Sequence, residues 1–140
     1  MERLRRAVDE RGWGLWAVDV DGVFAGFTGL NTPGFSAHFT PCTEISWRFG
    51  REFWGRSLAL RAALEAISFG FESLRLAEIV AFTAVANVRS RRLMERLGFE
   101  RNASEDFDHP SIPEGHMLRR HVLYRLRPGL AAAESAPAFR

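Results

Sequence analysis

The feature that most constrains the fold of this sequence is a strand-like segment that runs into a glycine-containing loop and then into a long apolar segment. Residues 43–49 alternate, with Ile45 and Trp47 among the apolar side chains predicted on one strand face. Residues 50–55 interrupt this pattern, and residues 58–71 are apolar around most of a helical circumference, which predicts a largely buried helix. Free amides and the dipole at such a helix start attract anions. The sequence therefore predicts an anion site there, although an ordinary structural turn would contain similar glycines.

The remaining pattern alternates strands and helices. Residues 2–11 predict a short helix, because Leu4, Ala7 and Val8 lie at helical spacing before Gly12. Two β-rich runs between residues 15 and 30 flank Asp21-Gly22, which predicts a hairpin. Residues 77–83 predict a strand covered on both faces, residues 87–97 a second helix closed by Gly98, and residues 120–126 a last strand. Residues 31–41 and 102–115 are predicted to be loops.

This order predicts an α/β fold of the mixed α+β kind, with helices packed on a mixed central sheet. At 140 residues and 46% hydrophobic, the chain is long enough for one domain with a real core. We expect that domain to cover residues 1–127, and the Ala-rich residues 128–140 to form a flexible tail.

Composition narrows the functional classes. No apolar run approaches the roughly 20 residues that cross a bilayer, and the charged start does not resemble a signal peptide. Cys42 is the single cysteine, which excludes an intrachain disulfide and favours a soluble cytoplasmic protein. The four histidines lack metal-ligand spacing, so no metal site is predicted, although His109 and His121 could contact a substrate.

All 19 basic residues are arginine, and the isoelectric point is about 9.4 with a formal net charge of only +2. Acidic residues are interspersed with the arginines, so the chain lacks the single-sign block of a nucleic-acid-binding arm. Arginine also holds phosphates through bidentate hydrogen bonds, which suits a nucleotide-containing cofactor equally well. Composition alone does not separate these two uses.

Three sequence segments carry a family resemblance. Residues 44–48 (EISWR), 54–59 (WGRSLA) and 86–99 (ANVRSRRLMERLGF) resemble, in order and spacing, the GNAT acetyltransferase superfamily. Residues 106–110 and 118–124 are similar to the C-terminal end of one branch, the ribosomal-protein N-terminal acetyltransferases. The resemblance runs from about residue 4 to residue 126.

The resemblance implies a GNAT-like fold and direct transfer of the acetyl group of acetyl-CoA to a primary amine. The candidate catalytic residues are Glu44, as general base through water, and Ser90. The diphosphate is expected on the amides at the start of the helix after residue 57, and pantetheine along residues 47–49. The candidate cofactor-binding residues are Trp47, Phe49, Trp54, Gly55, Arg56, Ser57, Leu58, Ala59, Asn87 and Arg91.

Each candidate also has a purely structural interpretation. Asn87 could be a helix N-cap and Ser90 an ordinary first-turn residue. Glu44 could be a solvated strand residue paired with Arg48, and the aromatic residues could belong to the core. Two alternative functions follow: a catalytically impaired GNAT-fold binding or assembly module, and an arginine-rich nucleic-acid binder, which would require salt-dependent RNA binding.

The sequence departs from the family pattern at two places. Ser57 stands where the family has glycine, whose missing Cβ lets the backbone approach a phosphate closely. Relatives also carry a first strand and helix before the region matching residues 2–11, so we expect residues 15–20 to form an unpaired sheet edge that favours a homodimer or other self-association. The acceptor is left open among protein N-termini, aminoglycoside-like antibiotics, amino acids and polyamines.

Overall fold

The computed structural model describes residues 2–6 and 14–129 of the chain. Its strands and helices, in chain order, are β1 (Glu2–Arg6), β2 (Leu15–Val20), β3 (Val23–Asn31), β4 (Glu44–Phe49), η1 (Arg51–Phe53), α1 (Leu58–Ser68), η2 (Phe69–Ser73), β5 (Ile79–Ala84), α2 (Val88–Arg96), β6 (Glu100–Arg101), η3 (Ala103–Glu105), β7 (Phe107–Asp108) and β8 (Arg120–Leu126). The described strands form one mixed sheet in the order β1-β2-β3-β4-β5-β8-β6, and β7 pairs with β8. The predicted mixed fold is confirmed.

The hairpin and the strand after it are also confirmed. β2 pairs antiparallel with β3, and β3 pairs antiparallel with β4. Asp21 and Gly22 both have positive φ, 50° and 83°, as the predicted tight turn requires. In this antiparallel meander, β4 is paired along its whole length only on the side of β3.

The predicted first helix is wrong. Residues 2–6 form β1, which pairs antiparallel with β2 from Glu2↔Val20 to Arg6↔Trp16. The helical interpretation depended on only three apolar residues, and pairing with the free side of β2 outweighs so weak a local preference. The expectation that residues 15–20 form an unpaired edge is wrong for the same reason. Residues 7–13 and 130–140, which include part of the expected helix and most of the expected tail, lie outside the described residues.

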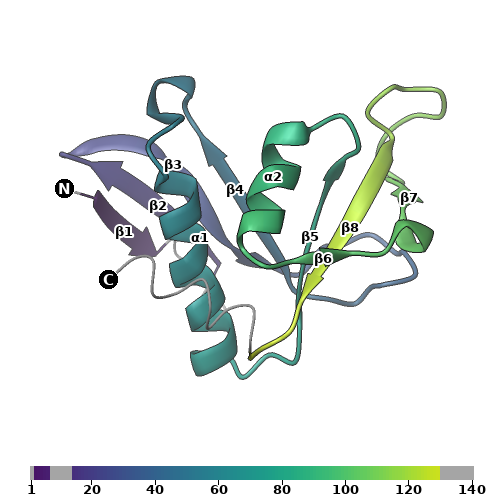
Figure 1. Cartoon of the computed structure of the whole chain (residues 1–140), viewed down its shortest axis with the longest axis horizontal. Helices are drawn as coiled ribbons and strands as arrows, with labels where there is room; N and C mark the ends of the chain where they lie inside the picture. Colours follow the sequence, from purple (N-terminus) through teal and green to yellow (C-terminus); the bar gives the residue numbers. More distant parts are fainter. Residues whose placement is uncertain (1, 7–13, 130–140) are drawn as a thin grey trace.

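Both α-helices pack on one face of the sheet (Figure 1). The core between them combines side chains of α1, α2 and the sheet, among them Leu60, Ile67, Met94 and Tyr124, all buried. The predicted helix 58–71 is α-helical only to Ser68 and continues as the π-helical turn η2. Within the described residues, no helix combines the length and apolar character needed to cross a membrane.

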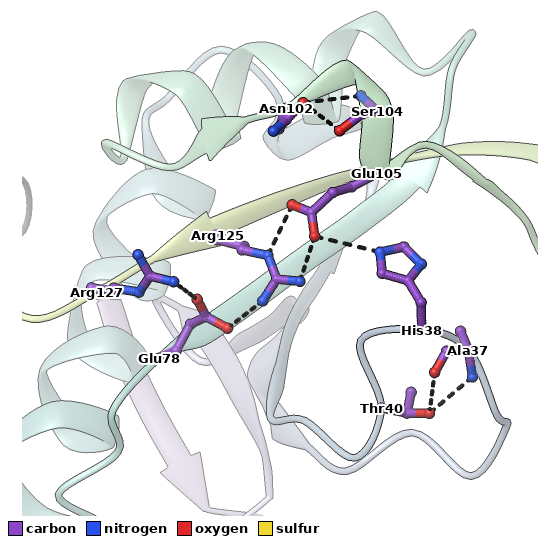
Figure 2. A network of polar contacts seen from close by, with 9 residues as sticks. All are labelled: Ala37, His38, Thr40, Glu78, Asn102, Ser104, Glu105, Arg125 and Arg127. Atoms are coloured by element: carbon purple, nitrogen blue, oxygen red, sulfur yellow. Dashed lines mark hydrogen bonds and ion pairs between the residues drawn. The ribbon is translucent and has the colours of Figure 1, made fainter.

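The opposite face carries a second, smaller cluster around Phe39, Val80 and Leu123. Beside it, the Arg125 guanidinium lies between two carboxylates, 2.7 Å from Glu78 Oε1 and 2.6 Å from Glu105 Oε1 (Figure 2). The region 102–115, predicted to be loop, contains η3 and β7, and Glu105 ends η3. This network fastens η3 to β5 and β8.

Candidate functional site

The site begins where β4 and β5 separate. These two strands are parallel, and among the described residues Glu44↔Val80 is their one register pair. Beyond that pair the strands diverge towards their carboxyl ends, with α2 in front of the opening (Figure 1). Each strand is followed by a helix, so both helix N-termini lie at this end of the sheet, where α/β folds commonly bind ligands.

A cavity of about 870 Å³ lies at this opening. Its wall comes from the end of β4, the loop before α1, the first turn of α1 and one side of α2. Nine of the predicted site residues line it: Trp47, Phe49, Trp54, Gly55, Ser57, Leu58, Ala59, Asn87 and Ser90. Eight further residues complete the wall: Arg48, Phe53, Leu60, Val88, Arg89, Arg92, Leu93 and Arg96.

The loop before α1 turns sharply into the helix. Gly55 has φ 82°, and Ser57, the N-cap, has φ 59° and ψ 19°, which is left-handed backbone. The first hydrogen bond of the helix runs from Arg61 N–H to the Ser57 carbonyl at 3.0 Å, and the Ser57 side chain caps no amide. The amides of the first turn therefore face the cavity with the helix dipole behind them, an arrangement that suits an anion.

Aromatic rings and arginines close the outer end of the cavity. Trp54 donates from Nε1 to the Phe49 carbonyl at 3.0 Å, which ties the loop back to β4. The Arg89 guanidinium carbon lies 3.9 Å from the centroid of the Trp54 ring. Trp54 is 43% exposed, so its ring belongs to the rim of the cavity and not to the core. The interpretation of Trp54 as a core residue is wrong.

The start of α2 forms the opposite wall. Asn87 is the N-cap, since its Oδ1 accepts from Ser90 N–H at 3.2 Å, and its Nδ2 donates to Thr83 Oγ1 at 3.0 Å. Ser90 Oγ accepts a long hydrogen bond, 3.4 Å, from Trp47 Nε1. The capping interpretation of Asn87 is therefore confirmed, and the same residue also lines the cavity.

Two predicted cofactor-binding arginines do not line the cavity. Arg91 points towards the sheet, where it donates from Nη1 to the Val85 carbonyl at 3.0 Å and from Nε to Tyr124 Oη at 3.5 Å. The guanidinium of Arg56 lies over the ring of Phe53, 5.4 Å from its centroid, beside the loop. Residues on α2 turn by about 100° per position, so Arg89 and Arg92 take the cavity side that the sequence had assigned to Arg91.

Glu44 lies at the closed end of the opening and does not line the cavity. Its strand face is the one opposite to Ile45 and Trp47, so it faces the side of the sheet away from the α-helices. Asn31 Nδ2 donates to Glu44 Oε1 at 3.3 Å, and Ser46 Oγ donates to Asn31 Oδ1 at 3.4 Å. Burial raises the pKa of Glu44 to about 7, against a smaller lowering effect of the Asn31 hydrogen bond.

These contacts test the structural interpretation of Glu44. Among the described residues no ion pair joins it to Arg48, and the Glu44 side chain is half-buried. The interpretation as a solvated strand residue paired with Arg48 is wrong. A carboxyl group that titrates near neutral pH can exchange protons with a substrate under physiological conditions.

The sheet face that carries Glu44 also carries a group of rings. Phe82, two residues beyond Val80 on β5, lies near Phe35, His109 and His121, with ring centroids 5.6 to 6.3 Å away. Burial lowers the pKa of both histidines, which favours their neutral forms. Among the described residues, no cluster of three His, Cys, Asp or Glu side chains is placed to hold a metal ion.

The fold and the cavity together define a class: an α/β domain that opens its sheet between two parallel strands and places a helix N-terminus at the opening. Residues 1–100 match the family described as the acetyltransferase (GNAT) domain. The chain belongs to this family.

Individual relatives agree with this assignment. Over 91% of its length the chain is 29% identical to the FsC-acetyl coenzyme A-N(2)-transacetylase of Aspergillus fumigatus, of which it covers 60%. It superposes on a GNAT-family acetyltransferase from Bacillus anthracis with a TM-score of 0.65 at 25% identity, covering 81% of this chain and 66% of that one. The Salmonella typhimurium protein yncA, whose structure contains its cofactor acetyl-CoA, gives 0.67 at 20% identity, covering 83% and 65%. The chain thus spans less than two thirds of the length of each relative.

Proposed function

We propose that this chain is an acetyl-CoA-dependent N-acetyltransferase that transfers the acetyl group directly to a primary amine. The observation that carries the proposal is the cavity between the first turn of α1 and the diverging end of β4, in a chain of the GNAT family. We further propose that the catalytic domain extends over residues 1–127 and that residues 128–140 form a tail outside it.

The cavity suits the parts of the donor. The diphosphate would accept hydrogen bonds from the amides of the first turn of α1, after Ser57. The pantetheine arm, which carries amide groups, would pair with the backbone of residues 47–49, where β4 has no strand partner on the side of β5. The acetyl end would then lie near the point where the two strands meet, close to Glu44.

The reaction requires a proton acceptor and a proton donor. An acceptor ammonium reaching the sheet from the Glu44 face would lose a proton to that carboxylate, directly or through a water molecule. The free amine would attack the thioester carbonyl, forming the C–N bond and breaking the C–S bond. Ser90 Oγ accepts from Trp47, so its hydroxyl would pass its proton to the departing sulfur and take up in exchange the proton that the attacking nitrogen releases.

The acceptor belongs to the class of primary amines. The resemblance of residues 106–110 and 118–124 to the ribosomal-protein branch supports a protein N-terminus. The A. fumigatus relative is named for transfer to an N(2) position, which supports a small-molecule amine equally well. A screen of amine acceptors with detection of the released thiol distinguishes these two.

Calorimetric titration with acetyl-CoA tests the donor site, and the absence of binding at millimolar concentration would refute the proposal. Glu44→Gln then tests the base: we expect turnover to fall by roughly 10²–10⁴-fold while the affinity for acetyl-CoA is unchanged. Glu65→Gln, the same chemical change at an exposed position of α1, is the control and should leave both unchanged. A chain that binds acetyl-CoA but has no turnover with any amine would instead be a binding module, as the strained Ser57 in the phosphate loop would favour.

A further inference from the structure

Four rings from separate segments meet on the sheet face opposite the helices. Phe35 lies in the loop before β4, Phe82 on β5, His109 after β7 and His121 at the start of β8. Neighbouring ring centroids lie 4.6 to 6.3 Å apart, and those of the two histidines are separated by 5.0 Å. Phe35 and Phe82 are half-buried, so part of each ring reaches the surface. We call these four residues the ring cluster.

The hydrogen bonds of the two histidines fix which ring nitrogen carries the proton. His121 Nδ1 lies 3.1 Å from the Arg119 carbonyl, which can only accept, so Nδ1 carries the proton and Nε2 is left as an acceptor. His109 Nδ1 accepts from Ser111 N–H at 3.1 Å, so in the neutral ring Nε2 carries the proton and is a donor. Burial lowers the pKa of both rings, which favours these neutral forms.

Both Nε2 atoms are available to a ligand. Among the described residues neither has a hydrogen-bond partner, and neither belongs to the polar atoms that are sealed from solvent without one. A cluster that served only as a core would pair such atoms or exclude them, because burying an unpaired polar group is costly. The two histidines therefore present one donor and one acceptor side by side. This combination matches the carbonyl oxygen and the N–H of a peptide chain.

The ring cluster lies close to the proposed base. Val80 on β5 is the register partner of Glu44, and Phe82 follows Val80 on the same strand face. Two residues of a strand span about 7 Å, which is also the length of two residues of an extended peptide. An acceptor whose amine lies at Glu44 therefore places the groups next to its amine at the ring cluster.

The charges around the ring cluster disfavour a polycationic acceptor. The carboxylates beside it are already paired with arginine: Asp108 with Arg120 at 3.4 Å, and Glu105 with Arg125 at 2.6 Å. A polyamine or an aminoglycoside needs several unpaired carboxylates to offset the cost of removing its charges from water. An uncharged chain has no such requirement, and its apolar groups gain from contact with aromatic rings.

We propose that the ring cluster binds the first residues of a peptide acceptor, so that the group acetylated is the α-amine of a peptide N-terminus with an apolar first side chain. His109 Nε2 donates to a peptide carbonyl, and His121 Nε2 accepts from a peptide N–H. Phe35 and Phe82 contact the first side chain. This inference rests on the proposed function, because it names the acceptor of the same transfer.

The first experiment compares acceptors by measuring thiol release from acetyl-CoA by the full chain. The acceptors are a tripeptide amide that begins with phenylalanine, the same peptide beginning with glycine, and spermidine. We expect kcat/KM for the phenylalanine peptide to exceed the values for the other two by at least about tenfold. Equal values for the two peptides, or equal or faster turnover of spermidine, would overturn the inference and leave the proposed function standing. Turnover with no amine at all would refute the proposed function itself.

The second experiment separates recognition from structure at His121. Asparagine can replace the Nδ1 donor to Arg119, whereas glutamine reaches the position of Nε2. In His121→Asn we expect kcat/KM for the phenylalanine peptide to fall about tenfold, mainly through KM, with KM for acetyl-CoA unchanged. His121→Gln should stay within about threefold of the wild type. Equal losses in the two variants, or a loss only in His121→Gln, would show that His121 has a structural role and would overturn the inference.

His109 has a matched control in His116. Both rings accept an amide N–H at Nδ1, His109 from Ser111 and His116 from Leu118 at 3.0 Å, but His116 is exposed and lies outside the ring cluster. We expect His109→Asn to lower kcat/KM for the phenylalanine peptide about tenfold and His116→Asn to leave it unchanged. Thermal unfolding of each variant confirms that it is folded. The same loss in both variants, or in neither, would overturn the inference.

Discussion

Ser57 is the residue whose backbone most limits the proposed donor site. It stands at φ 59° and ψ 19°, where a Cβ costs about 1–2 kcal/mol, while glycine is free of that penalty. We predict that Ser57→Gly raises the free energy of unfolding by roughly 0.5–1 kcal/mol, since the greater freedom of glycine in the unfolded chain offsets part of the gain. Chemical denaturation measures this change.

Ser57→Ala provides the comparison, because alanine keeps the strained backbone and removes only the hydroxyl. The serine side chain caps no amide, so alanine should leave stability within about 0.5 kcal/mol of the wild type. Ser57→Gly should also tighten acetyl-CoA binding, as the backbone can then approach the diphosphate. A glycine variant that is no more stable than the alanine variant would contradict the argument from backbone strain.

Glu44 links activity to stability through its pKa. Its folded-state pKa of about 7 lies above the unfolded value near 4.5, so between these values the folded state binds a proton that the unfolded state has released. The wild type therefore loses up to roughly 3 kcal/mol of stability as pH rises from 4.5 to 7, and Glu44→Gln does not. Urea unfolding at pH 5 and pH 8 should show that the free energy of unfolding of the variant, relative to that of the wild type, is higher at pH 8 than at pH 5.

The ionisation of Glu44 also determines how the reaction rate depends on pH. If the ionised carboxylate is the base, kcat/KM of the wild type rises with pH through about 7 and then levels. A stability difference between wild type and Glu44→Gln that is the same at both pH values would mean that this carboxyl group is not held protonated in the fold.

At the level of residues, the sequence predicted cavity-lining residues correctly where a residue type has one structural use at its position. It failed where the rotation of a helix decides which side chains face the cavity. The sequence placed nine candidate residues that line the cavity, because the resemblance to the GNAT family named them, while glycines and periodicity predicted the strand end and helix starts that carry them. It placed Arg91 there too, but a shift of two positions along a helix moves a side chain to the other side. Four neighbouring arginines, 89, 91, 92 and 96, cannot be sorted without knowing which side of α2 packs on the sheet.

At the level of elements, α2 depends on its cap. Asn87→Ala removes the acceptor for Ser90 N–H and should cost about 1 kcal/mol in thermal or chemical unfolding. Asn87→Asp keeps an acceptor there, and Thr83 can donate to it, so stability should be retained. The added negative charge lies on the cavity wall, so acetyl-CoA should bind at least about tenfold more weakly, and most weakly at low salt. If the aspartate variant binds acetyl-CoA as the wild type does, the start of α2 does not belong to the donor site.

Elements with several independent signals were predicted, and those with one weak signal were not. The hairpin combined β-rich runs with a turn dipeptide, and α2 combined a helical pattern with residues that cap its ends, while β5 and β8 were each predicted from an apolar or strand-like run. β1 lacked such agreement, because its strand character comes from pairing with β2, a contact between residues 10 to 18 positions apart. The end of α1 as the π-turn η2 is also a tertiary effect: a Cβ on Gly70 would lie 2.9 Å from Ile79 Cδ1, so close packing sets the helix path there.

At the scale of the whole molecule, Arg125 joins segments that are distant in the sequence on the sheet face opposite the helices. Arg125 on β8 binds Glu78 before β5 and Glu105 of η3, and Glu105 also lies 3.4 Å from His38 Nε2 (Figure 2). Segments far apart in the sequence, at residues 38, 78, 105 and 125, therefore converge there. Their pairing depends on the complete sheet, so sequence periodicity gives no signal for it.

We predict that Arg125→Met lowers the free energy of unfolding at pH 7 by about 2 kcal/mol, between the values for exposed and buried pairs, because both carboxylates are 22–23% exposed and lose their shared partner. The Arg125 guanidinium lowers the pKa of Glu105, so this stabilisation is present above about pH 4.5 and is lost as pH falls through the folded-state value. Denaturant unfolding from pH 7 to pH 3 should show wild type and variant converging at the acidic end. Arg120→Met, which removes a pair between half-exposed side chains, should cost less than about 1 kcal/mol. A constant difference from pH 7 to pH 3 would mean that Arg125 stabilises the fold through its packing and not through its charge.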